Sequence, residues 1–150
     1  MCTIRQATAT DVDAMLALGA GFFDFSQFAQ FVPFDPAGAR ASIAAAVDTG
    51  IAFVAEIDGR IIGAIMGILC PIWFNPSARL AAELGWWVDE GFRGSMAGVR
   101  LLQAFEAAAK EAGAVAVSMS DLSAGGTWPA ARLFERLGYT VVERCQMKGV

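Results

Sequence analysis

The stretch "WWVDEGFRGSMAGVRLLQAFE", residues 86–106, contains the signal that decides the fold. A bulky apolar run stops at Asp89, a short turn follows, and small residues open a helix that we expect to begin near Gly94. The first N–H groups of a helix lack intrahelical partners, and the helix dipole favours negative charge beside them. This strand-turn-helix unit therefore predicts an anion site that suits a phosphate.

Two other interpretations of the stretch are weighed against this one. The segment lacks the G-x-x-x-x-G-K-[ST] of P-loop proteins and the G-x-G-x-x-G of dinucleotide folds. Its small residues could also serve only to let the helix pack closely on the sheet, since Ser and Gly are common at helix N-termini. The neighbouring elements are needed to choose between binding and packing.

Local signals place elements on both sides of this stretch. Asp35 and Pro36 predict the start of a helix that Gly50 ends, and the pair Asp58-Gly59 predicts the turn of a hairpin over residues 51–69. Thr10 is a plausible N-cap for the first helix, with Asp13 three residues on as a partial capping box. The other expected elements are strands at 3–7, 82–88, 114–120 and 139–147, loops at 71–77 and 121–128, and helices at 94–113 and 129–137.

This order predicts one α+β domain over residues 1–150. A long antiparallel section precedes alternating strands and helices, so we expect a mixed, largely antiparallel twisted sheet with helices on both faces. Apolar residues make up 56% of the chain and charged residues 17%, a balance that favours a packed core over disorder.

Composition also excludes several classes of function. The net charge of −4 comes without a basic cluster, which disfavours nucleic-acid binding. The longest apolar stretch is broken by Pro71 and is too short to span a membrane. The three cysteines are far apart in sequence and fit a reducing cytoplasm. The absence of histidine excludes histidine-based catalysis and histidine-ligated metals, so we expect no metal.

The chain resembles the GNAT superfamily of acyl-CoA-dependent N-acyltransferases. "VDEGFRGSMAGVRLLQAFE" resembles that family's strand-turn-helix signature, an Arg or Gln followed by x-x-Gly-x-Gly/Ala. The opening "TIRQATATDVDAM", the Asp-Gly hairpin and the later "PAARLFERLGYTVVE" follow in the family's order. The resemblance implies acetyl-CoA as co-substrate and direct transfer of the acetyl group to a primary amine of a small molecule or a peptide. Polyamines, aminoglycosides, amino acids and protein N-termini all stay open as acceptors.

The resemblance also implies a coenzyme site. The turn's backbone amides would hold the diphosphate, and the strand ending at Val88 would part from its neighbour to admit pantetheine. Met96 departs from the pattern because it replaces the middle glycine, where its side chain could crowd the phosphate. The expected coenzyme-binding residues are Val88, Arg93, Gly94, Ser95, Met96, Ala97, Gly98 and Phe134.

Catalysis needs a base, because a lysine-type amine is neutral in only about one molecule in a thousand at pH 7. Glu83 stands where related enzymes often position a glutamate for this purpose; the alternative is a solvated carboxylate. Phe134 replaces the tyrosine that commonly protonates the thiolate, so Ser120 and Tyr139 are the substitutes to test, although Tyr139 also fits core packing. Thr127 stands where an asparagine is common in the GNAT superfamily, which is a further departure from that family's pattern.

Aromatic residues mark two further features. Trp86 and Trp87 should face opposite sides of the sheet. The phenylalanine-rich segment 22–34 either packs its helix or, if exposed, indicates a hydrophobic acceptor or a homodimer interface. Beside the enzyme, two alternatives stay open: a coenzyme A-binding regulatory module, and an oligomerising structural protein on the same scaffold.

Overall fold

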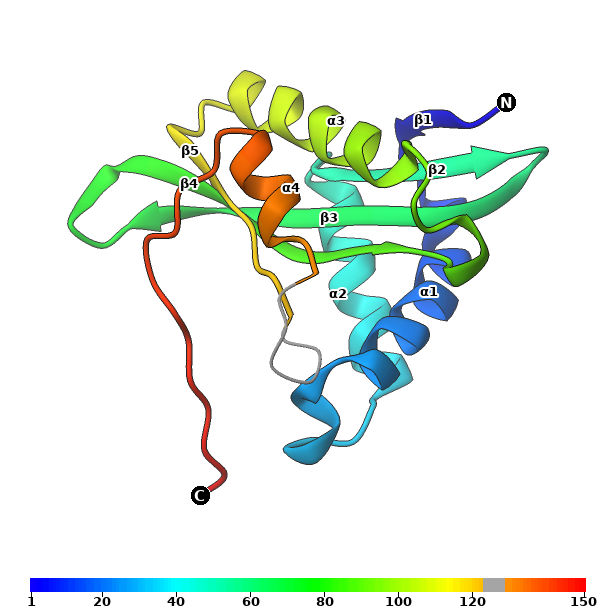
Figure 1. The fold of residues 1–150 in the computed structure, drawn as a ribbon, viewed down its shortest axis with the longest axis horizontal. Helices are drawn as coiled ribbons and strands as arrows, with labels where there is room; N and C mark the ends of the chain where they lie inside the picture. Colours follow the sequence, from blue (N-terminus) through cyan, green and yellow to red (C-terminus); the bar gives the residue numbers. More distant parts are fainter. Residues whose placement is uncertain (123–128) are drawn as a thin grey trace.

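The computed structural model describes residues 1–122 and 129–150, which form a five-stranded sheet in the order β1-β2-β3-β4-β5 (Figure 1). The strands are β1 (Thr3–Gln6), β2 (Ala52–Ile57), β3 (Arg60–Ile72), β4 (Asn75–Val88) and β5 (Ala116–Ser118). Neighbours pair antiparallel except β4 and β5, which are parallel. The predicted fold class is confirmed.

Helices cover both faces of this sheet (Figure 1). The helices are α1 (Val12–Phe25), α2 (Pro36–Asp48), α3 (Ala97–Glu111) and α4 (Ala131–Arg136). One core cluster joins α1 and α2 to the sheet around Met15, Ile43 and Val54. The other joins α3 and α4 to the opposite face around Phe105 and Phe134. Successive side chains of a strand point to opposite faces of the sheet, so the same strands contribute residues to both core clusters.

The strongest local signals are confirmed. Asp35 accepts a hydrogen bond from the amide of Ala37 at 3.1 Å, with Pro36 as the first residue of α2. Asp58 and Gly59 adopt φ values of 49° and 79°, the left-handed conformations that a two-residue hairpin turn requires.

The N-cap predicted for the first helix is wrong, because Asp11 and not Thr10 is the N-cap of α1, and Thr8 caps the 3-10 turn before it. The turn Ala9–Asp11 precedes α1, and Asp11 rather than Asp13 accepts the returning bond, from the Thr8 amide at 2.8 Å. The sequence offers the same Thr-x-x-Asp spacing at residues 8 and 10. Arg5 selects the first, because its guanidinium binds both carboxylate oxygens of Asp11 at 2.8 Å.

The predicted loop at residues 71–77 is also wrong, because most of it lies in strands. β3 runs to Ile72 and β4 starts at Asn75, so that only Trp73 and Phe74 form the turn. Pro71 is accommodated because the ladder is irregular beside it, and a proline is tolerated in a strand where the ladder is interrupted.

The C-terminal strand predicted at 139–147 does not form. Residues 139–150 are irregular, and the segment runs apart from the sheet (Figure 1), with Val141 79% and Val142 88% exposed. Local apolar content favours an extended chain, but a strand also needs a neighbour for its N–H and C=O groups. Among the described residues, none pairs with this segment.

Three further boundaries differ from the predictions. The strand expected at 114–120 contracts to Ala116–Ser118, and the last helix to Ala131–Arg136. The helix expected near Gly94 starts at Ala97, because Gly94 has a φ of +81°, outside the helical region.

In the described part of the chain, every helix is too short or too polar to cross a bilayer.

Candidate active site

The strands β4 and β5, the last two in the order of the sheet, pair over only part of the length of β4. They pair only from Leu80–Ala116 to Ala82–Ser118. Beyond Ala82, residues 83–88 of β4 pair only with β3. The edge of β4 that faces away from β3 therefore carries backbone groups that no described strand binds, while β4 ends at Val88 as predicted.

A bulge lies at the same point of β4. Gly67 of β3 pairs with Glu83 and Met66 pairs with Gly85, so Leu84 is an extra residue. A bulge bends its strand and increases the local twist. Glu83 is therefore the residue at which β4 both bends and leaves β5.

The Glu83 carboxylate lies in the opening between these strands. Its Oε2 accepts a hydrogen bond from the backbone N–H of Ser120 at 3.3 Å. The side chain is partly buried, and this burial raises the pKa of Glu83 to about 7 against the lowering effect of the Ser120 amide. The fold thus brings Glu83 and Ser120 together, through the backbone of Ser120 rather than its hydroxyl, and gives Glu83 the pKa of an effective base at neutral pH.

The anion site predicted from the sequence falls on the turn between β4 and α3. A short 3-10 turn, Glu90–Phe92, leads to Gly94, and the Ser95 hydroxyl binds the Phe92 carbonyl at 2.7 Å and accepts from the Ala97 amide at 3.3 Å. Other amides remain without an acceptor among the described residues. They are the N–H groups of Gly94, Met96, Gly98 and Val99, called the α3 amide cradle below.

Met96 lies within the cradle and its side chain is exposed. Its side chain is 62% exposed, while its backbone is helical in conformation and its N–H belongs to the cradle. A residue with a Cβ is accommodated here because the left-handed position of the turn falls on Gly94 instead. Crowding of a bound phosphate by the Met96 side chain stays a prediction.

Arg93 has other partners than the cradle. Its guanidinium lies 4.2 Å from the centre of the Trp87 ring, and its Nε donates to the Val88 carbonyl at 3.2 Å. A contact between Arg93 and phosphate stays a prediction, and it would require the side chain to leave Trp87.

The two tryptophans lie on opposite faces, as predicted. Trp86 packs on Phe134 at 5.7 Å between ring centres and donates its Nε1–H to the carbonyl of Gly98 at 3.1 Å. Trp87 packs against Phe22 and Phe25, both at 5.4 Å. Trp86 therefore fixes the start of α3 against β4. The sequence showed only a small residue at position 98, without indicating which side chain approached it.

The candidates for a proton donor lie in different environments. Phe134 is 9% exposed and packs between Trp86 and Tyr139. The Tyr139 hydroxyl donates to Glu106 Oε1 at 2.7 Å, and burial together with this carboxylate raises the tyrosine's pKa. Tyr139 is thus a packing residue bound to α3. Ser120 is exposed beside Glu83, whereas Thr127 lies outside the described residues.

Asp121 is a polar residue that the sequence reasoning missed. Its Oδ1 accepts from the Ala130 amide at 3.2 Å, while its Oδ2 is buried without a hydrogen-bond partner among the described residues. Burial raises the pKa of this carboxyl. Its contact with Ala130 holds the start of α4 to the end of β5, and no local sequence signal indicates it.

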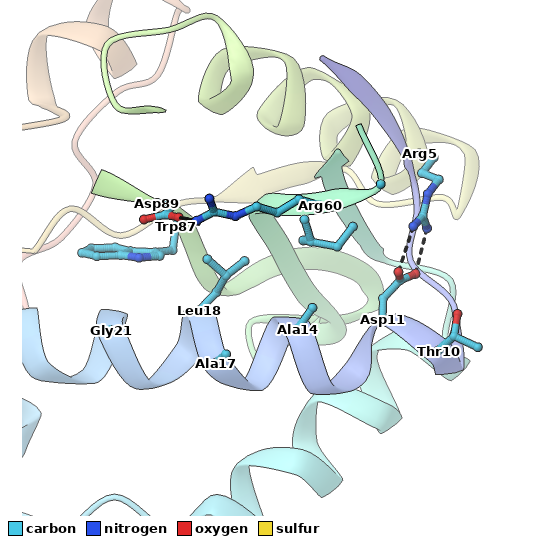
Figure 2. Close-up of a pocket in the computed structure, with 12 residues that line it drawn as sticks. Arg5, Thr10, Asp11, Ala14, Ala17, Leu18, Gly21, Arg60, Trp87 and Asp89 are labelled. Carbon is cyan, nitrogen blue, oxygen red and sulfur yellow. Dashed lines mark hydrogen bonds and ion pairs between the residues drawn. The ribbon is translucent and has the colours of Figure 1, made fainter. Parts of the chain in front are cut away.

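A cavity of about 700 Å³ lies between α1 and the ends of β1, β3 and β4 (Figure 2). Figure 2 shows Asp11 held by Arg5, and Asp89 lies beside Arg60. The hydrogen bonds from Arg5 hold the pKa of Asp11 well below its usual range. Both carboxylates are already neutralised by arginines, so this cavity is a poor site for a cation.

The fold and the site define a class: a mixed α+β domain in which helix N-terminal amides without a described acceptor, and the partly buried carboxylate of Glu83, lie beside a sheet that opens between β4 and β5. The family model for the acetyltransferase (GNAT) family matches residues 21–139. The chain belongs to that family. No curated protein sequence matches it significantly.

Solved structures with the same fold support this assignment. An acetyltransferase from Trypanosoma brucei has a TM-score of 0.73 and 18% identity, covering 100% of both chains. A predicted acetyltransferase from Clostridium acetobutylicum, solved with acetyl-CoA, has a TM-score of 0.77 and 13% identity, covering 99% of this chain and 96% of that one. A transcriptional regulator from Bacillus halodurans has a TM-score of 0.75 and 20% identity, covering 100% of both. At these identities the similarity shows the fold alone.

Proposed function

We propose that this protein is an N-acetyltransferase that moves an acetyl group from acetyl-CoA to a primary amine by direct transfer within a ternary complex. The observation that carries the proposal is the position of Glu83. It lies where β4 leaves β5, on the strand that leads to the α3 amide cradle.

The described residues fit coenzyme A. The cradle offers N–H groups at the N-terminus of a long helix, which suits a diphosphate. The free edge of β4 over residues 83–88 offers backbone partners to the amide groups of pantetheine. Bound acetyl-CoA would supply the reactive thioester, and no metal is needed for this chemistry.

The protein's own groups supply proton transfer and orientation. Glu83 accepts the proton of the ammonium group, directly or through water, so that the neutral amine attacks the thioester carbonyl. The Ser120 amide holds the carboxylate in place for this step. Protonation of the departing thiolate falls to the Ser120 hydroxyl or to solvent, because Phe134 carries no hydroxyl and Tyr139 is bound to Glu106.

A second candidate, a coenzyme A-binding regulatory module, is favoured by one observation: the ring of Phe134 is buried and carries no hydroxyl, at the position where the resemblance leads us to expect a tyrosine. The third, an oligomerising structural protein, predicts no response to the coenzyme. The free cysteines Cys2, Cys70 and Cys145 favour the cytoplasm as the location in each case.

Two measurements separate these candidates. Acetyl-CoA, but not NAD, should raise the melting temperature; at 100 times Kd the stabilisation is about 2.7 kcal/mol. An absent shift would favour the structural protein.

Release of coenzyme A over a broad amine panel should then occur with the wild type and fall about 10²- to 10⁴-fold in Glu83→Gln. Binding without turnover on any amine would favour the regulatory module.

A further inference from the structure

The indole ring of Trp86 connects three elements at the place where β4 has left β5. Trp86 lies opposite Ile65 of β3, beyond the last residue of β4 that pairs with β5. Its ring packs against Phe134 of α4 at 5.7 Å between ring centres, and its Nε1–H donates to the Gly98 carbonyl of α3 at 3.1 Å. The side chain therefore joins β4 to the first turn of α3 and to α4.

The indole ring also lies directly against the backbone of α3. A Cβ built on Gly98 would lie 3.4 Å from Trp86 Cζ2 and 3.6 Å from Val88 Cγ2, which are ordinary contact distances. Because position 98 carries no side chain, the helix backbone comes close enough to the indole for its carbonyl to accept the hydrogen bond.

This hydrogen bond acts on a member of the α3 amide cradle. A peptide unit is planar and trans, so the C=O of one residue and the N–H of the next lie in one plane and point in opposite directions. The Gly98 carbonyl shares its peptide unit with the N–H of Val99, one of the cradle amides. Holding that carbonyl therefore fixes the direction of the Val99 N–H. A donor on the carbonyl also polarises the unit, which strengthens the N–H across it.

From these contacts we infer that Trp86 is a positioning residue for the coenzyme: by holding the Gly98 carbonyl, it aims the Val99 N–H and the first turn of α3 at the diphosphate. This inference rests on the coenzyme site of the proposed function and adds the side chain that orients it. The indole contributes to diphosphate binding without touching the ligand. A packing role alone would need the ring but not its N–H.

Trp86→Phe tests the inference, because it keeps an aromatic ring beside Phe134 and removes the N–H donor. The matched control is Trp73→Phe, in the turn between β3 and β4, where the side chain is 80% exposed. The Kd of coenzyme A, measured by calorimetry, should rise about tenfold in Trp86→Phe and less than twofold in Trp73→Phe. Tenfold corresponds to about 1.4 kcal/mol, close to the contribution of one hydrogen bond to a charged group.

A comparison of two acyl donors separates positioning from a general loss of structure. Acetyl-CoA carries the diphosphate, whereas acetyl-pantetheine carries the same thioester without it. In Trp86→Phe, KM for acetyl-CoA should rise about tenfold while kcat stays within about twofold of the wild type, and kcat/KM for acetyl-pantetheine should also stay within about twofold. Equal losses with both donors would make Trp86 a packing residue and overturn the inference.

The wild type offers a measurement that does not depend on the folding of a variant. In NMR spectra, the indole N–H of Trp86 should be protected from exchange with solvent, and its resonance should shift together with the Val99 amide when coenzyme A is added. The indole resonance of the exposed Trp73 should do neither. Rapid exchange of the Trp86 N–H, or an indole resonance that ignores the coenzyme, would contradict the positioning role.

The outcomes distinguish this inference from the proposed function. If coenzyme A binds Trp86→Phe as tightly as the wild type, the positioning role fails and the acetyltransferase proposal is untouched. If the variant binds the coenzyme about tenfold more weakly and neither protein acetylates any amine, the positioning role stands and the catalytic proposal fails. If the wild type does not bind coenzyme A, both fail.

Discussion

At the scale of single residues, the chemistry depends on the environment of Glu83. Opposite it, Gly67 leaves room for the close approach of β3, β4 and α3, because a Cβ there would lie 2.5 Å from both the Ala82 carbonyl and the Phe105 ring. Burial then gives the carboxylate a pKa of about 7. Glutamate at this place was expected from the resemblance, but its amide partner and its pKa depend on residues far along the chain.

The pH dependence of activity follows from this pKa. Since the base must be deprotonated, kcat/KM should rise with pH along a limb with an apparent pKa of about 7 and should lose that limb in Glu83→Gln. Rate profiles between pH 5 and 9 with one amine test this. A limb that persists unchanged in the variant would remove Glu83 as the base.

Stability should show the opposite dependence. The folded protein binds the Glu83 proton more tightly than the unfolded chain, in which the pKa of this carboxyl is about 4.5. Burying the charged carboxylate therefore lowers the free energy of unfolding as the pH rises above 4.5, and the loss is complete above about pH 7. Glu83→Gln should therefore raise the free energy of unfolding at pH 8 by about 1–3 kcal/mol and leave it unchanged at pH 4. Denaturant titrations at both values measure this, and equal effects would contradict the burial of Glu83.

Gly67→Ala should destabilise the protein by about 1–3 kcal/mol, because the backbone carbonyl of Ala82 cannot move away cheaply. The matched control is Gly91→Ala, where a Cβ meets nothing within 4 Å. Thermal unfolding of both variants compares them. Equal melting temperatures would show that the strands do not approach this closely.

At the scale of elements, the sequence correctly predicted the caps and turns that a few neighbouring residues determine. The Asp35 cap and the Asp58-Gly59 turn each involve neighbours in sequence. The first helix was misplaced because two Thr-x-x-Asp sets compete and Arg5 of another element chooses between them. The α3 amide cradle was expected from the sequence, whereas the placement of Arg93 on Trp87 required the tertiary structure.

The cradle makes a specific prediction about the turn. Gly94→Ala should weaken coenzyme A binding about tenfold, because a φ of +81° strains a residue with a Cβ by roughly 1–2 kcal/mol. Met96→Gly should change Kd less than twofold, since that side chain already lies in solvent. Calorimetry with coenzyme A checks both. A marked gain in affinity for Met96→Gly would mean that the thioether does obstruct the phosphate.

At the scale of the whole molecule, the class of sheet could be predicted, because the turns and patterns indicate a long antiparallel section followed by alternating strands and helices, whereas the order and pairing of β1 to β5 required the structure. The absence of a strand at residues 139–147 could not be predicted. The sequence pattern shows the segment's own preference for an extended conformation, but it does not show whether a neighbouring strand is present to pair with it.

The C-terminal segment gives a test at this scale. Backbone amides of residues 140–147 should exchange with solvent without protection, because no hydrogen bond joins them to the described part of the chain. Those of β3 should be strongly protected. Hydrogen exchange followed by mass spectrometry distinguishes the segments, and strong protection at 140–147 would show that the strand predicted from the sequence forms in solution.

The most direct test of the central claim is a crystal structure with acetyl-CoA. The diphosphate oxygens should lie about 2.7–3.2 Å from the N–H groups of Gly94, Met96, Gly98 and Val99. Pantetheine should run along residues 83–88, and the thioester should lie beside Glu83. A coenzyme bound elsewhere, with the Met96 side chain filling the cradle, would contradict the proposed function.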